Sequence, residues 1–310
     1  MRPTVYIPNL NGSERLARTL ESLAGQTIVP RVVVVDNGSS DDSVAMMTKR
    51  FPDVTAIALE ENIGFGSALN LAIEREPGDP IVLLNNDVVC EPTFIEALLE
   101  PAAAGAQMVA AVLLQPDGSG RIDSAGVIAD SALMGFDYLN GEPAEQALGA
   151  ADPLGPTGGA ALIRAELFRR VGGFDEQIFL YYEDLDLALR MRAAGADCSL
   201  APKARAVHDY SQTLGARSSA KYARTGWSRG YMLRRYGVMR RPLLAARAVI
   251  CEGAICAGQL VRERTLSGLR GRFAGWRAGR GLPQRKMPRT GLSGLSVRDA
   301  LALRRRRYGS

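Results

Sequence analysis

The chain has 310 residues, of which 46% are hydrophobic and 23% are charged. These values exclude a disordered or fibrous protein and leave enough apolar residues for one large globular domain or two smaller ones. Charge is distributed unevenly, because residues 201–310 contain 25 Lys and Arg against 4 Asp and Glu, although the net charge of the whole chain is +5. This asymmetry predicts either that the last third faces an anionic membrane, nucleic acid or phosphate groups, or that it forms a solvated basic tail.

The cysteines and the first residues indicate a reducing compartment. The four cysteines lack CxxC spacing and the density of a disulfide scaffold, so we expect buried thiols and no zinc site. The chain enters a strand-like run at residues 4–7 without the basic and apolar segments of a secretory signal, so we expect it to be cytoplasmic. The apolar stretch at 243–261 contains Arg247, Glu252 and Gln259. We expect it to be too polar to span a membrane, although it could lie on a membrane surface.

The first hundred residues alternate between short β-branched runs and segments long enough for helices, which predicts a parallel α/β sheet. The runs are apolar almost throughout, as is typical of strands that are covered on both faces. We expect four such strands, at residues 4–7, 32–35, 55–59 and 81–84. Polar residues follow these strands at the carboxyl ends, where open α/β sheets bind their ligands.

Beyond residue 101 the alternation weakens. We expect a strand at 108–114, a turn at 116–120 and a connection rich in Gly, Pro and Ala at 141–159. The elements that follow are predicted to be a strand at 160–163, a helix at 165–171 ended by Gly172 and Gly173, a helix at 183–194 closed by Gly195, and a strand at 204–207. After His208 the sequence is helical and basic to about residue 280, and we expect the remainder to be loosely ordered.

The first motif with chemical potential follows the strand at 32–35. Asp36 and Asn37 stand at its end, and Gly38 permits a turn into a helix that Ser40 or Asp41 would cap. A carboxylate at the end of a buried strand can accept hydrogen bonds from a ribose or a nucleobase. Taken alone, the segment could equally be an ordinary strand-to-helix turn.

The second motif is Asn85-Asn86-Asp87, after the strand at 81–84. Because side chains alternate along a strand, we expect Asn85 and Asp87 to point the same way. Together they could hold Mg²⁺ or Mn²⁺ against a diphosphate, because these cations prefer oxygen ligands and neutralise the charge that develops on a nucleoside diphosphate leaving group. The alternative is a polar turn in which Asp87 caps a helix.

Two further features are a run of carboxylates and a lone histidine. Glu183, Asp184 and Asp186 lie at the start of a predicted helix, where the helix dipole stabilises ionised carboxylates that can act as general bases. Helix capping would explain the same residues. His208 is the only histidine, which excludes mechanisms that need two, and it is either a metal ligand, a base or a structural residue.

Several familiar signatures are absent from the sequence. It has no GxxxxGK[ST] phosphate-binding loop and no GxSxG nucleophile motif, and the Gly64-Phe65-Gly66 segment lacks the third glycine of a dinucleotide fingerprint. These absences argue against kinases, serine hydrolases and dehydrogenases.

Seven motifs instead occur in the order found in one enzyme family. They start at Ile7, Val35, Glu61, Leu84, Gly172, Tyr182 and His208, and they read IPNLNG, VDNGSSD, ENIGFGSALN, LNND, GGFDE, YEDLD and H. Over about residues 3–236 the chain resembles the family-two GT-A glycosyltransferases, and in particular their rhamnosyltransferase-like branch. The resemblance implies a GT-A fold with a mostly parallel sheet, an inverting transfer from a nucleotide-diphosphate sugar, and a divalent metal, Mn²⁺ or Mg²⁺.

The resemblance also implies roles for individual residues. The donor would contact Pro8, Asn9, Asn11, Asp36, Asn62, Gly64, Asn70, Asn85 and Asn86, with Asp36 on the nucleobase. Asn85-Asn86-Asp87 matches the family's D-x-D motif, although Asn85 stands where many members carry aspartate, and Asp87 and His208 would be metal ligands. Asp184 matches the family's general base. Gly158, Gly159, Glu183 and Asp186 are expected on the acceptor side.

These features combine into one expected organisation. Residues 1–210 would form the catalytic domain, with a nucleotide-sugar half at about 1–115 and an acceptor half at about 116–210. Residues 211–310 would form a basic, mainly helical extension that rests on an anionic membrane. Its membrane-facing residues are expected to be Arg229, Arg234, Arg235, Arg240, Arg241 and Arg247, together with Leu233, Leu243, Leu244, Val249 and Ile250.

The expected function is transfer of L-rhamnose from dTDP-rhamnose to a hydroxyl of a glycan or lipid-linked glycan, at the inner face of the cell membrane. UDP-linked donors fit nearly as well. One rival is a nucleic-acid-binding protein that uses the Arg-rich end, although this end lacks interleaved aromatic residues for base stacking. A second rival is a nucleotidyltransferase or pyrophosphatase on a related sheet.

Overall fold

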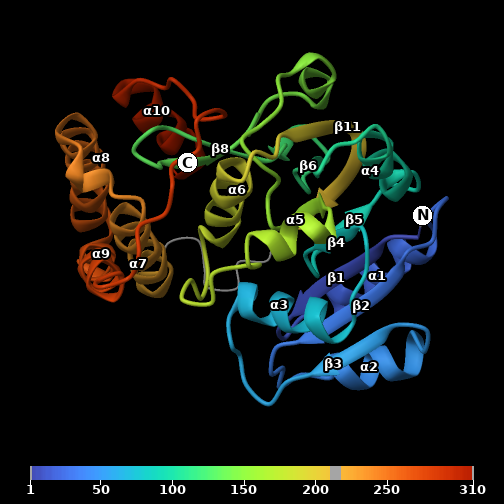
Figure 1. Ribbon diagram of the computed structural model, residues 1–310. Coiled ribbons are helices and arrows are strands. Elements are labelled where there is room, and N and C mark those ends of the chain that lie inside the picture. Colours follow the sequence, from blue (N-terminus) through green and yellow to red (C-terminus); the bar gives the residue numbers. More distant parts are fainter. Residues whose placement is uncertain (1, 210–217, 309–310) are drawn as a thin grey trace.

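The computed structural model describes residues 2–209 and 218–308, with side chains up to residue 303. Within these residues nine strands form one central sheet in the order β3-β2-β1-β4-β10-β6-β11-β5, with β7 paired to β6 (Figure 1). The strands are β1 (Thr4–Asn9), β2 (Arg31–Asp36), β3 (Thr55–Ala58), β4 (Ile81–Leu84), β5 (Val88–Cys90), β6 (Met108–Leu114), β7 (Ile122–Ser124), β10 (Ala160–Ile163) and β11 (Cys198–His208).

The sheet is mixed. Strands β3, β2, β1 and β4 are parallel neighbours, as the alternating pattern predicts. Strand β10 runs antiparallel to both β4 and β6, because the segment that leads to it contains no α-helix to make the crossover that a parallel pair needs. Strand β11 is parallel to β6 and antiparallel to β5. The α/β architecture is therefore confirmed, and its antiparallel pairs lie where the alternation in the sequence weakens.

Alternate residues of each strand face opposite sides of the sheet, so the sheet buries two apolar layers. Tyr6 and Val33 pack in the layer that α3, α5 and α6 cover, whereas Val5 and Val34 pack in the layer that α1, α2 and α4 cover. Because both faces are covered, the central residues of these strands are apolar, and polar residues occur at the strand ends. The helices are α1 (Ser13–Ala24), α2 (Ser43–Arg50), α3 (Phe65–Arg75), α4 (Phe94–Ala103), α5 (Ala165–Arg170) and α6 (Glu183–Ala193).

Glycines end two of these helices, as the sequence predicts. Gly172 and Gly173 follow α5 with φ of 78° and 64°, and the Gly173 N–H donates to the carbonyl of Phe168 at 2.9 Å. Gly195 follows α6 with φ of 89°. Cys90, Cys198 and Cys251 are buried thiols, as expected, whereas Cys256 is half-buried.

The region between β7 and β10 forms a small structure of its own. It contains a two-stranded antiparallel sheet of β8 (Val127–Ala129) and β9 (Gly135–Asp137), followed by the 3-10 helix η1 (Ala144–Gly149). The connection that was expected to be irregular at 141–159 therefore includes one helical turn. Its last residues, Thr157 to Gly159, lead directly into the centre of the sheet at β10.

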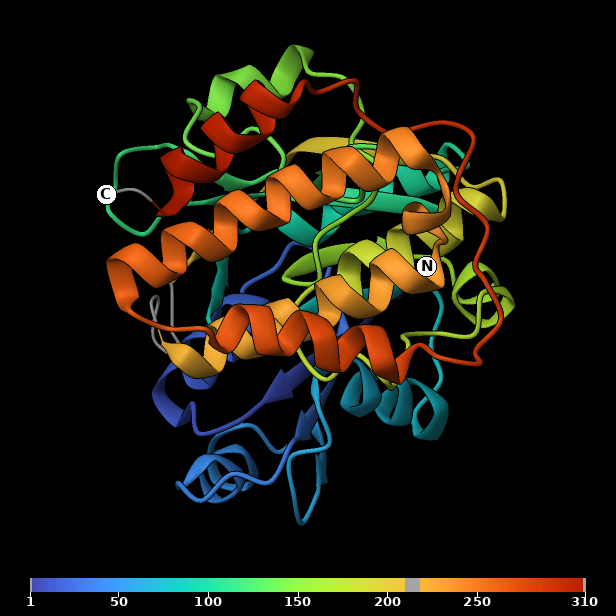
Figure 2. The ribbon, with the colours of Figure 1, turned by 90° about the vertical axis from the view of Figure 1, so that its left-hand side faces the viewer.

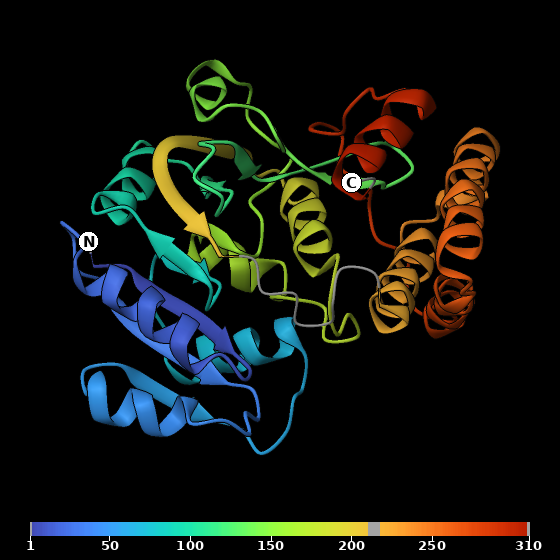
Figure 3. The same cartoon turned by 180° about the vertical axis from the view of Figure 1, so that it is seen from behind.

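Three C-terminal helices form a layer on the side of α6 that faces away from the sheet (Figures 1 and 3). They are α7 (Ser219–Arg235), α8 (Pro242–Glu263) and α9 (Ser267–Ala278), with the short 3-10 helix η2 (Val238–Arg240) before α8. Helices α7 and α9 touch through their backbones, because a Cβ at Gly275 would lie 1.8 Å from the carbonyl oxygen of Trp227. Figure 2 looks onto the outer side of this layer, which α8 crosses.

Several expectations for this C-terminal part are corrected. Residues 297–308 form helix α10 (Val297–Tyr308) and are not loosely ordered. Within the described residues α8 is one helix that is long and apolar enough to cross a membrane by length and composition, so the expectation that it is too polar is wrong by that criterion. Arg229 and Leu233 are buried and cannot face a membrane. The expected domain boundary at 210/211 lies outside the described residues.

Candidate active site

Residues 85–87 form a turn between β4 and β5, in the middle of the sheet. Because they do not continue the strand, the alternation that would align Asn85 with Asp87 does not apply. Each residue instead contacts a different part of the protein. The side chain of Asn86 contacts β1, Asp87 contacts β11, and the backbone N–H of Asn85 donates to the carbonyl of Gly159 at 3.0 Å. The candidate site is therefore centred on this turn.

A chain of side-chain hydrogen bonds joins the ends of β4, β1 and β2. Asn86 Nδ2 donates to Asn9 Oδ1 at 2.7 Å, and Asn9 Nδ2 donates to Asp36 Oδ2 at 2.8 Å. Ser39 donates to Asp36 from its hydroxyl at 2.7 Å and from its backbone N–H at 2.9 Å. Among the described residues, Asp36 Oδ1 accepts a hydrogen bond only from this N–H. It can therefore accept one more hydrogen bond.

Gly12, Asn11 and Pro8 lie along the same edge. A Cβ at Gly12 would lie 2.4 Å from Asn86 Nδ2, so only glycine leaves room for the asparagine network. Asn11 has φ of 50°, and its Oδ1 accepts the backbone N–H of Ser40 at 2.8 Å. Pro8 is half-buried in β1, directly before Asn9. The expected nucleoside-side residues are thus brought together.

Asn62 and Gly64 form a loop that is fixed by an asparagine pair. Asn62 Oδ1 accepts the Gly64 N–H at 2.9 Å and Asn37 Nδ2 at 3.0 Å. Asn37, to which the sequence assigned no role, also donates to the Gly64 carbonyl and accepts the Ile63 N–H. Gly64 has φ of 97° and precedes α3, a conformation that disfavours other residues.

Asn70, an expected donor-contacting residue, joins α3 to the loop that follows α5. Its Nδ2 donates to the carbonyl of Phe174 at 3.0 Å, and its Oδ1 accepts the N–H of Phe174 at 2.8 Å. This pair of bonds holds the loop that carries the GGFDE motif against α3. The amide of Asn70 is therefore engaged within the protein.

The expected metal ligands lie next to each other. Asp87 Oδ1 is 3.3 Å from His208 Nε2, at the end of β11. On the other side of the ring, His208 Nδ1 is 2.8 Å from Oδ2 of Asp123, a buried residue of β7. Burial by itself would lower the pKa of His208, but the hydrogen bonds and charges of Asp123 and Asp87 raise it to about 10. No motif in the sequence identifies Asp123 as a site residue.

These residues fit a divalent cation that is shared with a ligand. Within the described part of the chain, no group of three or more His, Cys, Asp or Glu could hold a metal ion by itself. Asp87 and His208 could supply two ligands, and Asn85 Oδ1 is a buried oxygen with no hydrogen-bond partner among the described residues. Mg²⁺-type sites commonly combine one or two protein ligands with phosphate oxygens and water. The donor set therefore suits a cation bound together with a diphosphate.

Asp184 lies beside the glycine pair that precedes β10. Its Oδ2 accepts the Gly158 N–H at 3.2 Å, and its Oδ1 accepts the Leu185 N–H at 2.7 Å. A Cβ at Gly158 would lie 3.6 Å from the Asp184 Cβ, and a Cβ at Gly159 would lie 3.4 Å from Asn85 Nδ2. The two glycines thus separate Asp184 from Asn85, and burial raises the pKa of Asp184 against the effect of its hydrogen bonds.

Glu183 is a second buried carboxyl group next to Asp184. It is buried, and its Oε2 has no hydrogen-bond partner among the described residues. Burial, followed by the charge of Asp184, raises the pKa of Glu183 to about 8. At neutral pH Glu183 is therefore mostly protonated and cannot take up a further proton. Glu183 is thus a poor candidate for a general base.

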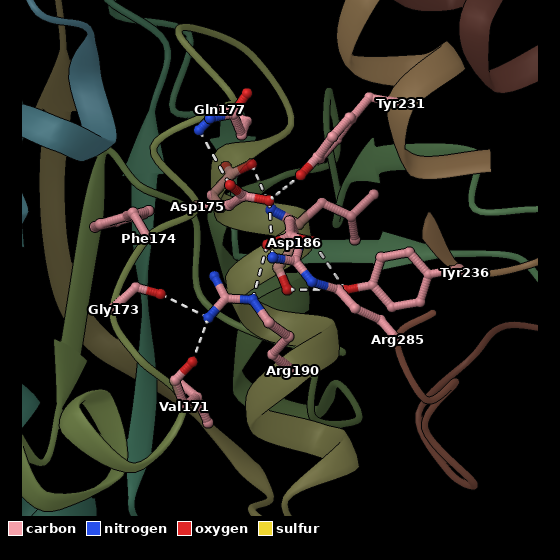
Figure 4. Close-up of polar contacts among 12 residues, drawn as sticks. Val171, Gly173, Phe174, Asp175, Gln177, Asp186, Arg190, Tyr231, Tyr236 and Arg285 are labelled. Carbon is pink, nitrogen blue, oxygen red and sulfur yellow. Dashed lines mark hydrogen bonds and ion pairs between the residues drawn. The ribbon is translucent and has the colours of Figure 1, made fainter. Parts of the chain in front are cut away.

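Asp186 does not reach the acceptor side, contrary to expectation. Its carboxylate is fully buried and is held by three side chains (Figure 4). Oδ2 accepts from Arg190 Nε at 2.8 Å, and Oδ1 accepts from the Tyr236 hydroxyl at 2.9 Å and from Arg285. The charge of Asp186 is thus used to attach the C-terminal helices to α6.

Comparison with known proteins agrees with this geometry. Residues 4–172 match the model of the family described as glycosyl transferase family 2. The chain belongs to this family. This family-2 glycosyltransferase is 30% identical over 233 residues to N-acetylglucosaminyl-diphospho-decaprenol L-rhamnosyltransferase of Mycobacterium tuberculosis, a match that covers 64% of this chain and 73% of that protein. It is 28% identical to pre-mycofactocin glycosyltransferase of the same organism, over 68% of this chain and 43% of that one. The rhamnosyltransferase-like resemblance is confirmed.

Two solved structures show that the family-2 glycosyltransferase has the GT-A fold. One is GalNAc-T7 with UDP, GalNAc and Mn²⁺, at 17% identity and a TM-score of 0.59, over 79% of this chain and 51% of that chain. The other is the mannosyltransferase PcManGT from Pyrobaculum calidifontis with GDP-Man and Mn²⁺, at 18% identity and a TM-score of 0.55, over 97% of this chain and 78% of that chain. The chain thus spans about half of the GalNAc-T7 chain that it matches.

Proposed function

We propose that the enzyme transfers L-rhamnose from dTDP-L-rhamnose to a hydroxyl of a lipid-linked glycan, with inversion at the anomeric carbon. The observation that carries the proposal is the buried carboxylate of Asp184, which lies beside Gly158 and is separated from Asn85 by Gly159. In a single displacement Asp184 takes the proton of the acceptor hydroxyl while that oxygen attacks the anomeric carbon. The nucleoside diphosphate then leaves from the opposite face, and no covalent intermediate is needed.

The donor is proposed to lie along the ends of β1, β2 and β4. Asp36 Oδ1 keeps capacity to accept a hydrogen bond from the nucleobase, and Asn9 and Asn86 hold Asp36 in place. The rhamnosyl group is supported by the 30% identity with the mycobacterial L-rhamnosyltransferase. A UDP-linked sugar is the alternative donor.

A divalent cation, Mn²⁺ or Mg²⁺, is proposed to be held by Asp87 and His208 together with the diphosphate. Both solved structures of this fold described above contain Mn²⁺. When bound, such a cation neutralises charge on the diphosphate leaving group. Asp123 accepts the hydrogen bond from His208 Nδ1, so the Nε2 side of the ring faces Asp87.

The acceptor is proposed to be presented by an anionic membrane, at its cytoplasmic face, on which α8 lies. Every exposed residue between 242 and 261 is apolar, and Leu243 and Val261 are 86% and 79% exposed. These residues recur at the spacing of one helix face, and they are Pro242, Leu243, Ala246, Val249, Ile250, Gly253, Ala254, Ala257, Leu260 and Val261. Exposed arginines at both ends of the helix match anionic headgroups.

The ion pairs on the opposite face of α8 favour a helix that lies in the membrane plane and does not cross the bilayer. Arg247 pairs with the buried Asp130 at 2.6 Å, and Glu252 pairs with Arg229 and Arg272, each at 2.5 Å. These ion pairs attach α8 to the rest of the enzyme along its length. A helix that crossed the bilayer would have to carry Arg247 and Glu252 into hydrocarbon without their partners, which is costly.

The same ion pairs weaken the nucleic-acid alternative. Arg229, Arg247, Arg272 and Arg285 are paired with carboxylates inside the protein, so these arginines are not available to contact phosphates. We therefore propose no nucleic-acid partner. A nucleotidyltransferase or pyrophosphatase would release pyrophosphate or a sugar phosphate, whereas a glycosyltransferase releases a nucleoside diphosphate, so the product distinguishes these alternatives.

A donor panel tests the proposal. The purified enzyme is incubated with Mn²⁺, with N-acetylglucosaminyl-diphospho-decaprenol as the acceptor probe, and with dTDP-rhamnose or one of several UDP sugars. We expect release of dTDP and a glycolipid whose anomeric configuration, determined by NMR, is opposite to that of the donor. Release of pyrophosphate or sugar phosphate would favour a nucleotidyltransferase or pyrophosphatase, and retained configuration would contradict the single displacement.

A further inference from the structure

The segment before Asp184 has an unusual backbone. Tyr181 and Tyr182 are consecutive residues with φ of 70° and 71°, and α6 begins immediately afterwards at Glu183. Left-handed conformations at residues other than glycine cost of the order of 1–3 kcal/mol each, and they persist only where the surroundings enforce them. The position of Asp184, the second residue of α6, therefore depends on what holds residues 179–182 and the first turn of the helix.

Helix α7 of the C-terminal layer holds this segment from one side. The guanidinium of Arg224 stacks over the ring of Phe179 at 4.1 Å, and that of Arg229 lies over the ring of Tyr182 at 5.5 Å. The Ser228 hydroxyl donates to the carbonyl of Leu180 at 3.4 Å. Arg229 is 2% exposed and is itself fixed by Glu252 of α8. Phe179, Leu180 and Tyr182 therefore each contact α7.

Arg285 holds the first turn of α6 through Asp186 (Figure 4). It pairs with Asp186, two residues after the proposed base, and with Asp175 of the GGFDE loop at 2.7 Å. Tyr236 donates to Asp186, and Tyr231 donates to Asp175 at 2.8 Å. The charge of Arg285 and the hydrogen bond from Tyr231 outweigh burial and lower the pKa of Asp175. Arg285, Tyr231 and Tyr236 all belong to the C-terminal extension.

We propose that the C-terminal extension positions the catalytic base, and that Arg285 is the central positioning residue of this arrangement. The proposal rests on the proposed function, in which Asp184 is the base. Arg285 is the group through which two carboxylates, the half-buried Asp175 on the GGFDE loop and the buried Asp186 on α6, are joined. Removing its charge leaves both carboxylates with fewer partners, so that Arg190, which binds Asp186 and the carbonyls of Val171 and Gly173, becomes the main link between the loop and the start of α6 and the first turn of α6 is held less firmly. A displacement of about 1 Å at a reacting group can lower a rate about 100-fold.

The test compares Arg285→Gln, Arg285→Lys and the milder Tyr236→Phe with a matched control, Arg280→Gln. Arg280 is an exposed arginine five residues earlier whose side chain makes no hydrogen bond or ion pair with the residues that the structure describes. Turnover is measured as dTDP release from dTDP-rhamnose, donor affinity by calorimetry, and local order by hydrogen exchange of the peptide that covers residues 178–187.

We expect Arg285→Gln to lower kcat at least about 10-fold, with unchanged donor affinity and faster exchange in the 178–187 peptide. Arg285→Lys, which keeps the charge but loses the two-pronged contact, and Tyr236→Phe should show smaller changes in the same direction. Arg280→Gln should match the wild type. If Arg285→Gln does not fold, Arg285→Lys and Tyr236→Phe still test the proposal.

Two results would overturn the proposal. One is a folded Arg285 variant with wild-type kcat and wild-type exchange in this peptide. The other is a parallel loss of donor affinity and turnover, which would mean general unfolding. A wild-type enzyme that releases no nucleoside diphosphate would refute the proposed function, whereas the exchange measurement would still decide whether Arg285 orders residues 178–187.

Discussion

Asp123 is a buried carboxylate whose contact with His208 Nδ1, at 2.8 Å, fixes the orientation of the imidazole toward Asp87. Hydrogen-bond partners of this kind typically contribute 10- to 100-fold to metal affinity. We therefore predict that Asp123→Asn weakens Mn²⁺ binding by about 10-fold or more in calorimetric titrations performed with dTDP. The amide removes the negative charge and can present either its oxygen or its nitrogen to the ring.

The matched control is Asp117→Asn, which makes the same change at an exposed turn where the carboxylate contacts Ser119. It should leave Mn²⁺ affinity unchanged. Equal affinity for the wild type and Asp123→Asn would mean that the imidazole of His208 is not a metal ligand or does not need Asp123.

Glu183 predicts a dependence of stability on pH. Its pKa is raised from 4.5 to about 8 in the folded protein, so between these values the folded state keeps a proton that the unfolded state has lost. The stability that Glu183 supports is thus complete below about pH 4.5 and decreases as the pH rises toward 8. Glu183→Gln stays neutral throughout. The melting temperature of the variant minus that of the wild type should therefore increase as the pH rises from about 4.5 to about 8, and it should be constant above pH 8.

This prediction is checked by thermal melts of both proteins from pH 5 to pH 9. Parallel curves for the wild type and Glu183→Gln would show that the carboxyl group titrates near its ordinary pKa. They would also remove the reason for assigning the base to Asp184 and not to Glu183.

At the level of single residues, the sequence identified the ends of the strands but not every partner. The structure brings together Asp36, Asn86, Asp87 and His208. Each lies at or just after the carboxyl end of a strand, and these strand ends face the same side of the molecule. Asp123 could not be found in this way, because it lies in a three-residue strand and its partner is 85 residues away in the chain. The sequence also gave no sign that Asp186 is held in ion pairs inside the protein, because its partner Arg285 is 99 residues away in the chain.

At the level of elements, the close contact between α7 and α9 is the feature most sensitive to a single methyl group. Gly275→Ala would place a Cβ 1.8 Å from the backbone carbonyl of Trp227, so the helices would have to move apart. Such overpacking typically costs about 1–3 kcal/mol. We predict a loss of this size in the free energy of unfolding, measured by urea denaturation.

Gly253→Ala is the control for helix propensity. Gly253 lies in α8 with nothing within 4 Å of its would-be Cβ, so alanine should be neutral or stabilise the protein by up to about 1 kcal/mol. If Gly275→Ala were as stable as Gly253→Ala, the two helices could not be in backbone contact.

The elements that the sequence predicts well are those with strong periodic patterns. The four parallel strands and the helices at 165 and 183 agree closely with the structure, because burial on both faces and terminal glycines leave clear signals. The antiparallel direction of β10 depends on the path of a connection without periodicity. Helix α10 was missed because its arginine-rich composition resembles that of a disordered tail.

At the level of the whole molecule, the apolar outer face of α8 and its flanking arginines predict two separable contributions to membrane binding. The double variant Leu243→Gln/Ile250→Gln should reduce liposome binding about 10-fold or more at both low and high salt, because the burial of each side chain contributes more than about 1 kcal/mol. The variant Arg240→Gln/Arg241→Gln should weaken binding to anionic liposomes at low salt alone, by about 1 kcal/mol for each charge.

Sedimentation with neutral and anionic liposomes at two salt concentrations measures both contributions. Leu148→Gln is the control, since Leu148 is an exposed leucine that lies in η1 and not in α8. Equal binding to neutral and anionic liposomes at low salt would contradict the electrostatic contribution. Unchanged binding of Leu243→Gln/Ile250→Gln would remove α8 from the membrane contact.

The central claim is that Asp184 acts as the general base of a glycosyl transfer, and its most direct test is Asp184→Asn. The amide keeps the shape of the side chain but cannot take a proton, so turnover of dTDP-rhamnose should fall by about 10²- to 10⁴-fold. Donor affinity, measured by calorimetry on the same preparation, should stay close to that of the wild type. A variant that keeps more than about a third of wild-type turnover, well short of the loss that removal of a general base causes, would contradict the account.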